Sequence, residues 1–188
     1  LVRMYGRRSL FMHVKAKILA FGGLLLALTV IFMMLGGIIE SNTLFLLAAA
    51  SYFVGIMIRE TNFRMGAAFY LASVILGFLV VPNKFYVASY AAMGFYILAI
   101  EGIWERMGCL SEKYQKRSLF WILKYVIFNV IYLPVLFGFQ ELLFSRQLSL
   151  PFLIGAVLAG QIGLIIYDKA YEYFQGHIWS RMRGRFLN

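Results

Sequence analysis

The chain has 188 residues, of which 62% are hydrophobic and only 14% are charged, so it is far more apolar than an ordinary soluble domain. Its formal net charge of +10 is compatible with nucleic-acid binding, but the basic residues lie between and beyond apolar runs, where lipid headgroups and membrane topology explain them. The composition therefore argues against a soluble enzyme and against a nucleic-acid partner, and it predicts an integral membrane protein.

Six apolar segments are each about long enough to cross a hydrocarbon core of about 30 Å as a helix. In chain order they cover residues 16–39, 43–58, 65–81, 85–104, 118–139 and 151–167. Apolar runs continue to the end of the sequence, unlike a secretory signal peptide followed by a polar domain. We therefore predict an all-α fold, a single transmembrane domain over residues 1–188 with six membrane-spanning helices.

The orientation follows from the distribution of lysine and arginine, which collect on cytoplasmic flanks. Of the 18 basic residues, only Lys84 and Arg146 lie on one side of the six predicted spans, and the other sixteen lie on the opposite side. This places both termini in the cytoplasm. The outer loops are then residues 40–43, 82–84 and 139–151, and the last is long enough for a short interfacial helix.

Catalytic groups are missing from the predicted spans. His13 and His177 lie in the cytoplasmic tails, and Cys109 lies in a charged loop with no second cysteine to pair with. No metalloprotease, serine-hydrolase or phosphate-loop motif occurs. We therefore expect no enzyme activity, no catalytic residue, no metal and no cofactor.

Two charged side chains and two amides lie well inside the predicted spans. Glu101 and Lys124, near the cytoplasmic ends of the fourth and fifth spans, are expected to form a buried ion pair between adjacent helices. The alternatives are a proton relay and a Lys124 side chain that reaches the interface. Asn129 and Gln161 lie nearest the middle of the bilayer and are expected to link helices, with a ligand contact as the alternative.

The first span carries a stripe of small residues, Ala16, Ala20, Gly23 and Ala27, at spacings of four, three and four that place them on one helical face. With its opening run KAKILAFGGLLLALTVIF, this helix resembles the first helix of the substrate-binding S components of energy-coupling factor vitamin transporters. In that family an alanine-x-x-x-alanine contact docks the S component on a transmembrane coupling protein driven by two ATPase subunits. Ala16-x-x-x-Ala20 and Gly23-x-x-x-Ala27 match that contact.

The resemblance implies a high-affinity solute-binding subunit of an importer for a vitamin or similar small molecule. Such a subunit would be a multi-pass protein of the plasma membrane of a bacterium. The solute would bind in the outer half, where the loop between the first two spans would act as the gate. Candidate substrate-binding residues are Glu40, Asn42, Asn83, Tyr86, Tyr90, Tyr132 and Gln140. Tyr86 and Tyr90 share a helical face, although tyrosines at this depth also form interfacial belts.

Two further expectations stay open. The small-residue pattern also occurs in the second span at Ala48, Ser51 and Gly55, and in the sixth span at Gly155 with Ala159 and Ala156 with Gly160, so the stripe could serve internal packing. The alternative function is then a non-transport integral membrane protein that assembles with or regulates another membrane complex. The basic tails LVRMYGRRSLF and RGRFLN are expected to bind anionic lipid in either case.

Overall fold

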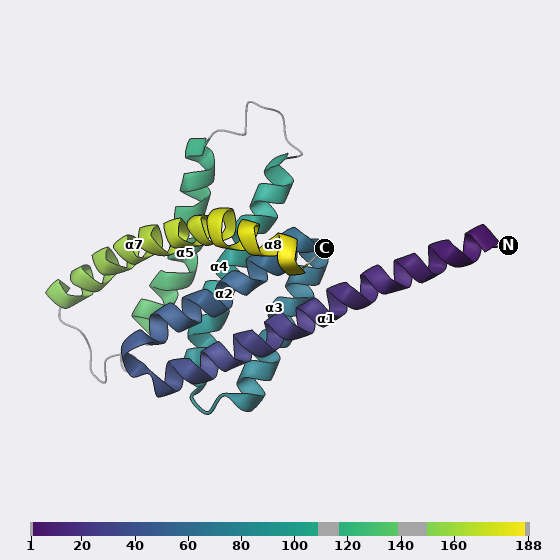
Figure 1. Cartoon of the computed structure of the whole chain (residues 1–188). Coiled ribbons are helices and arrows are strands. Elements are labelled where there is room, and N and C mark those ends of the chain that lie inside the picture. The colour runs from purple at the N-terminus through teal and green to yellow at the C-terminus, as the bar shows by residue number, and fades with distance from the viewer. Residues whose placement is uncertain (1, 109–116, 139–149, 187–188) are drawn as a thin grey trace. The chain divides into compact units, whose positions relative to one another are not determined.

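The computed structural model describes residues 2–108, 117–138 and 150–186 (Figure 1). All secondary structure within these ranges is helical, and no strand occurs in them. The elements in chain order are α1 (Val2–Ile38), the 3-10 turn η1 (Glu40–Asn42), α2 (Thr43–Glu60), α3 (Phe63–Val80), α4 (Lys84–Gly108), α5 (Arg117–Gly138), α7 (Leu150–Tyr173), the π-helix η3 (Phe174–Trp179) and α8 (Ser180–Phe186).

Within the described residues, six helical stretches are long and apolar enough to cross a membrane, which confirms the predicted fold class. They are Ala16–Ile38, Thr43–Glu60, Phe63–Val80, Lys84–Gly108, Ser118–Phe137 and Pro151–Arg183. The predicted spans agree with these to within a few residues, except that the last helical stretch continues well beyond residue 167. The predicted outer interfacial helix in 139–151 falls almost wholly outside the described residues.

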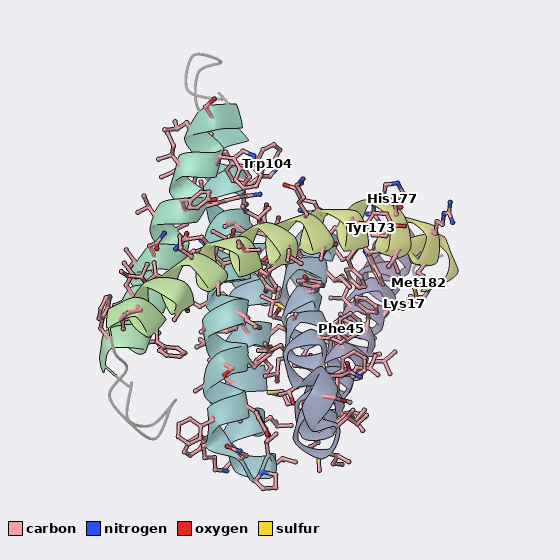
Figure 2. All side chains as sticks on the ribbon, turned by 90° about the vertical axis from the view of Figure 1, so that its left-hand side faces the viewer. Lys17, Phe45, Trp104, Tyr173, His177 and Met182 are labelled. Carbon is pink, nitrogen blue, oxygen red and sulfur yellow. The ribbon has the colours of Figure 1, made fainter. Side chains whose placement is uncertain are left out.

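The surface of the helices is itself apolar, as a lipid environment requires. Phe45 in α2 is 72% exposed and Trp104 in α4 is 60% exposed, and Figure 2 shows both side chains directed away from the helices that carry them. Large apolar side chains exposed to this extent are unfavourable in water but favourable against acyl chains. The chain is a multi-pass membrane protein.

Polar side chains and a proline mark the helix ends. Asn62 precedes α3, and its side chain accepts a hydrogen bond from the backbone N–H of Met65 at 2.9 Å, which is an N-cap. Pro82 stops α3, and the Asn83 side chain accepts from the N–H of Phe85 at 3.0 Å to start α4. The Lys84 ammonium donates to the carbonyl of Val81 at 2.9 Å, just beyond the end of α3.

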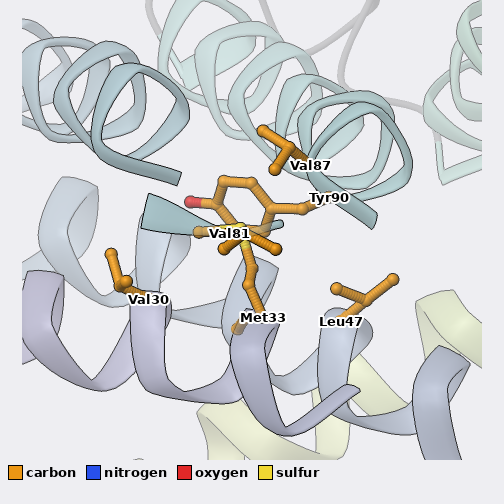
Figure 3. Packing of buried hydrophobic residues seen from close by; sticks show 7 residues of the cluster. Val30, Met33, Leu47, Val81, Val87 and Tyr90 are labelled. Atoms are coloured by element: carbon orange, nitrogen blue, oxygen red, sulfur yellow. The ribbon is translucent and has the colours of Figure 1, made fainter. Parts of the chain in front are cut away.

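The described chain forms two compact units, Leu1–Leu98 with Trp179–Asn188, and Ala99–Ile178. In the first unit, α1, α2 and α3 pack against one another and against the start of α4. Its apolar core contains Val30, Met33, Leu47, Ala50, Val81, Val87 and Tyr90 (Figure 3). Gly77 allows the Met33 side chain to reach this core, because a Cβ there would lie 2.8 Å from Met33 Cε. The second unit contains the end of α4, α5, α7 and most of η3.

Candidate functional site

The small-residue face of α1, formed by Ala16, Ala20, Gly23 and Ala27, is open. All four residues are exposed, and a Cβ built on Gly23 would meet no heavy atom within 4 Å. The neighbouring Gly22 lies on the packed side of the helix, where a Cβ would lie 3.2 Å from Met57 Cε in α2. The α1 face is therefore not used for packing among the described residues of the first unit.

The similar pattern in α2 has the opposite environment. Ser51 and Gly55 are buried, and the Ser51 hydroxyl donates to the carbonyl of Ala48 at 2.6 Å within the helix. Here the small residues allow close approach of neighbouring helices inside the first unit. The internal-packing interpretation thus describes α2, whereas α1 presents its small residues outward.

Tyr86 and Tyr90, two of the predicted substrate-binding residues, lie on one side of α4 but face the protein interior. Tyr90 is fully buried in the apolar core, and its hydroxyl shares a hydrogen bond with the Ser73 hydroxyl at 2.6 Å. Tyr86 is half-buried beside α1, where a Cβ at Gly37 would lie 3.1 Å from Tyr86 Cε2. These two rings serve the packing of the first unit.

The other predicted substrate-binding residues are not gathered into one described site. Asn42 and Asn83 are exposed at the starts of α2 and α4, and Glu40 begins η1. Tyr132 belongs to the second unit, where its hydroxyl donates to the carbonyl of Ala156 at 2.8 Å. Gln140 lies outside the described residues.

An apolar groove of about 340 Å³ runs between α3 and α4 near the start of α4. Its lining residues are Val74, Phe78, Lys84, Phe85, Val87, Ala88 and Ala91. The Lys84 ammonium at its edge donates to the carbonyls of Phe78 and Val81 and lies 4.9 Å from the centroid of the Phe78 ring. The groove does not include Tyr86 or Tyr90, so it differs from the predicted pocket.

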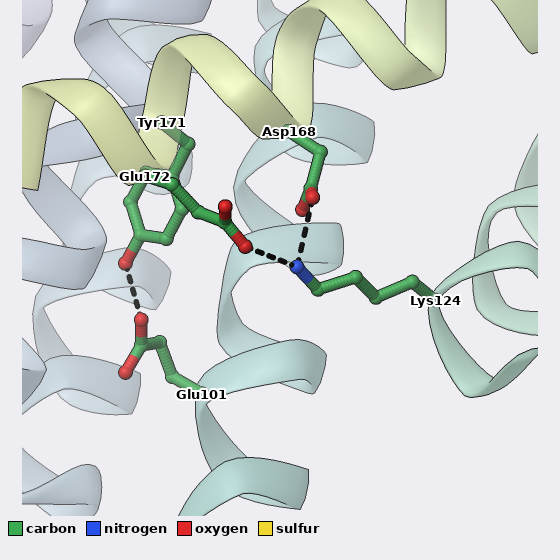
Figure 4. Close-up of polar contacts among 5 residues, drawn as sticks. All are labelled: Glu101, Lys124, Asp168, Tyr171 and Glu172. Atoms are coloured by element: carbon green, nitrogen blue, oxygen red, sulfur yellow. Dashed lines mark hydrogen bonds and ion pairs between the residues drawn. The ribbon is translucent and has the colours of Figure 1, made fainter. Parts of the chain in front are cut away.

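The second unit holds a buried charged cluster, shown in Figure 4. Lys124 of α5 donates to Asp168 Oδ2 at 2.8 Å and to Glu172 Oε1 at 2.9 Å, both on α7. The Tyr171 hydroxyl donates to Glu101 Oε1 at 2.5 Å. Lys124, Asp168, Tyr171 and Glu101 are all buried, while the Glu172 side chain is 56% exposed. The cluster joins the last turns of α7 to both α4 and α5.

The predicted ion pair between Glu101 and Lys124 is therefore wrong in its pairing. Both residues belong to the buried cluster, but the carboxylates that bind the Lys124 ammonium are those of Asp168 and Glu172. The reason is the length of α7: the sequence prediction ended that helix at residue 167, so Asp168 seemed interfacial. Asp168 and Glu172 are four residues apart, which places them on one helical face, and that spacing was the available signal.

Two amides join α5 to α7 in the apolar part of the second unit. The Gln161 Nε2 group donates to Asn129 Oδ1 at 2.9 Å, and Asn129 Nδ2 donates back to Gln161 Oε1 at 3.4 Å. Asn129 Nδ2 also donates to the carbonyl of Tyr125 at 2.8 Å. This reciprocal pair agrees with the interpretation of both residues as a link between helices.

A contact that the sequence did not predict closes the first unit where α2 ends. Glu60, at the end of α2, accepts hydrogen bonds from the Trp179 indole N–H at 2.8 Å and from Arg183 Nε at 3.0 Å. The Trp179 ring centroid lies 5.5 Å from that of Phe21 in α1. No local pattern connects residue 60 with residues more than a hundred positions later.

Within the described ranges, no group of three or more His, Cys, Asp or Glu side chains is placed to hold a metal ion. Searches against protein-family models, curated proteins and solved structures find no match to this chain.

Proposed function

We propose that this chain is the solute-binding membrane subunit of an energy-coupling factor type importer for a vitamin or similar small molecule in a bacterial plasma membrane. It docks through the small-residue face of α1 on a transmembrane coupling protein, and two ATPase subunits of the partner complex supply the energy. The observation that supports this proposal is the exposure of Ala16, Ala20, Gly23 and Ala27 on a membrane-spanning helix.

The physical argument concerns how helices associate in lipid. Acyl chains are as apolar as leucine, so helices associate through close van der Waals packing rather than through the hydrophobic effect. A face without large side chains brings a second backbone close, and the α1 face has no such neighbour among the described residues of the first unit. A transmembrane helix of another protein is the occupant that fits this face.

The solute site in this proposal includes fewer residues than the sequence suggested. Asn42 and Asn83 are exposed at the outer ends of α2 and α4, and the Asn42 amide and the Asn83 Nδ2 group are candidates for hydrogen bonds to a solute, since Asn83 Oδ1 already accepts from the N–H of Phe85. Glu40, Tyr86 and Gln140 stay as candidates on the sequence argument. Tyr90 and Tyr132 have structural roles instead, because one is in the core and the other donates to a backbone carbonyl.

The packing roles of Tyr90 and Tyr132 favour a second function. In it, the chain is a non-transport membrane subunit that assembles with or regulates another complex. Both functions need the α1 face, but they differ in the partner and in the solute.

Purification of the tagged chain from its native membrane in mild detergent, with mass spectrometry of the proteins that accompany it, separates the two functions. A coupling membrane protein with paired ATPases supports the importer. A complex without ATPases, in a preparation that retains no small molecule, contradicts it and supports the second function.

A further inference from the structure

The C-terminal strap, which we define as Trp179–Arg183, folds onto the cytoplasmic end of the first unit. Trp179 is 7% exposed, and the Glu60 side chain that it contacts is 6% exposed. The two Glu60 oxygens are used separately: Oε1 accepts from Trp179 and Oε2 accepts from Arg183. The Glu60 carboxylate therefore fixes the strap at two points, Trp179 and Arg183.

The outer surface of the strap is basic and lies beside the first turns of the α1 span. Arg181 and Arg183 are exposed, and Met182 between them is 42% exposed. Lys17 is exposed one helical turn before Phe21, whose ring makes a tilted contact with that of Trp179. We call Lys17, Arg181, Met182 and Arg183 the strap patch.

Within the first unit, little negative charge balances the strap patch. The sequence of the first unit contains two acidic residues, Glu40 and Glu60, and Glu40 lies at the opposite end of α1 and α2. Glu60 is already bound by the strap. Arg183 uses its Nε for Glu60 while its side chain stays 61% exposed, so the terminal nitrogens of the guanidinium are accessible to another anion.

We propose that the strap patch binds the headgroup of an anionic phospholipid of the cytoplasmic leaflet. Arg183 binds the phosphate through its terminal guanidinium nitrogens, Arg181 and Lys17 add positive charge at the interface, and Met182 contacts the acyl region. Glu60 acts as a positioning residue, because it holds one edge of the Arg183 guanidinium and directs the other edge outward.

The location selects a lipid over a soluble anion. Residue 16 begins the apolar span of α1, so Lys17 lies at the membrane interface, where anionic headgroups attract basic side chains. The exposed Met182 side chain would be unfavourable in a site for a small soluble anion but is favourable beside acyl chains. This proposal concerns the cytoplasmic end of the chain and does not depend on which solute is transported.

Native mass spectrometry of the full-length chain in detergent tests the proposal, with phosphatidylglycerol and phosphatidylcholine as probes. Arg181→Gln with Arg183→Gln is expected to lower retained phosphatidylglycerol by about tenfold or more and to leave phosphatidylcholine unchanged. Arg181→Gln alone, which leaves the Glu60 contacts intact, is expected to give a smaller loss in the same direction.

The matched control is Arg59→Gln with Arg64→Gln, which removes the same charge from exposed positions of the first unit outside the patch. Retention of phosphatidylglycerol by this control at close to the wild-type level supports a defined site. Equal losses in both double variants, or no loss in the patch variant, overturn the proposal. Displacement of phosphatidylglycerol by inorganic phosphate also overturns it, because the site would then bind the free anion.

Discussion

The two compact units are stabilised by different interactions. In the first unit, 56% of the α2 span is buried, and small residues such as Ser51 bring helices together around an apolar core. In the second unit, only 11% of the spans of α5 and α7 is buried, and these helices are linked by Lys124 with Asp168 and by Asn129 with Gln161. Close packing thus predominates in the first unit, which also has the polar contacts of Glu60 and of Ser73 with Tyr90, whereas polar pairs are the main links in the second.

This difference follows from the solvent. In a bilayer, burying apolar area between helices gains little, so either close backbone approach or a polar pair must hold them. Buried polar groups that satisfy one another also fix which helix meets which, because any other arrangement leaves them unsatisfied. The α1 small-residue face has the shape for close packing but no neighbour within the first unit, and Gly155, Ala159 and Gly163 of α7 are exposed in the same way.

The largest expected effect is in the second unit. Lys124→Met removes the ammonium from the fully buried Asp168 carboxylate and should cost about 3–5 kcal/mol of stability. Thermal unfolding in detergent should show a much lower midpoint than wild type. Lys124→Met combined with Asp168→Leu should recover part of the loss, and a single variant with a wild-type midpoint would contradict the assignment of this pair.

A smaller effect is expected from overpacking the first unit. Ser51→Leu adds volume at a position with no exposed surface, which should cost about 1–3 kcal/mol. Ala68→Leu makes a similar addition at an exposed position of α3 and serves as the control. Equal unfolding midpoints for the two variants would show that α2 is not tightly packed.

The smallest stability effect is expected for the amide pair. Asn129→Leu should cost about 0.6 kcal/mol, the average for polar side-chain pairs between membrane helices. Because the two amides bond to each other, the double variant with Gln161→Leu should lose less than the sum of the two single variants. Strictly additive losses in the same unfolding assay would contradict a direct pair.

The sequence predicted most of the fold because each span is a long apolar run bounded by polar or basic residues, as at Pro82 and Lys84. The hydropathy of a segment indicates the solvent that surrounds it, and lipid surrounds these helices. Spacing alone also located the α1 face, but it does not distinguish an exposed face from a packed one. The helices α1 and α2 illustrate this, because their similar small-residue patterns lie in opposite environments, exposed in α1 and buried in α2.

The polar contacts were less predictable because they join residues far apart in the chain. Glu101 and Lys124 were recognised as buried, but the partner of Lys124 depended on α7 continuing past residue 167. The Glu60 contact with Trp179 depended on the same continuation through η3 into α8. Tyr90 had the spacing of a pocket residue, and only the packing of α1 and α3 around α4 shows that it is core.

The central claim is that the α1 face docks on another membrane protein, and Gly23→Leu tests it most directly. A Cβ at Gly23 meets nothing within 4 Å, so the variant should unfold at the wild-type temperature. The measurement is the amount of coupling protein recovered with the tagged chain, relative to Ala68→Leu. We predict that Gly23→Leu loses the partner while Ala68→Leu keeps it, and equal recovery from both variants would contradict the claim.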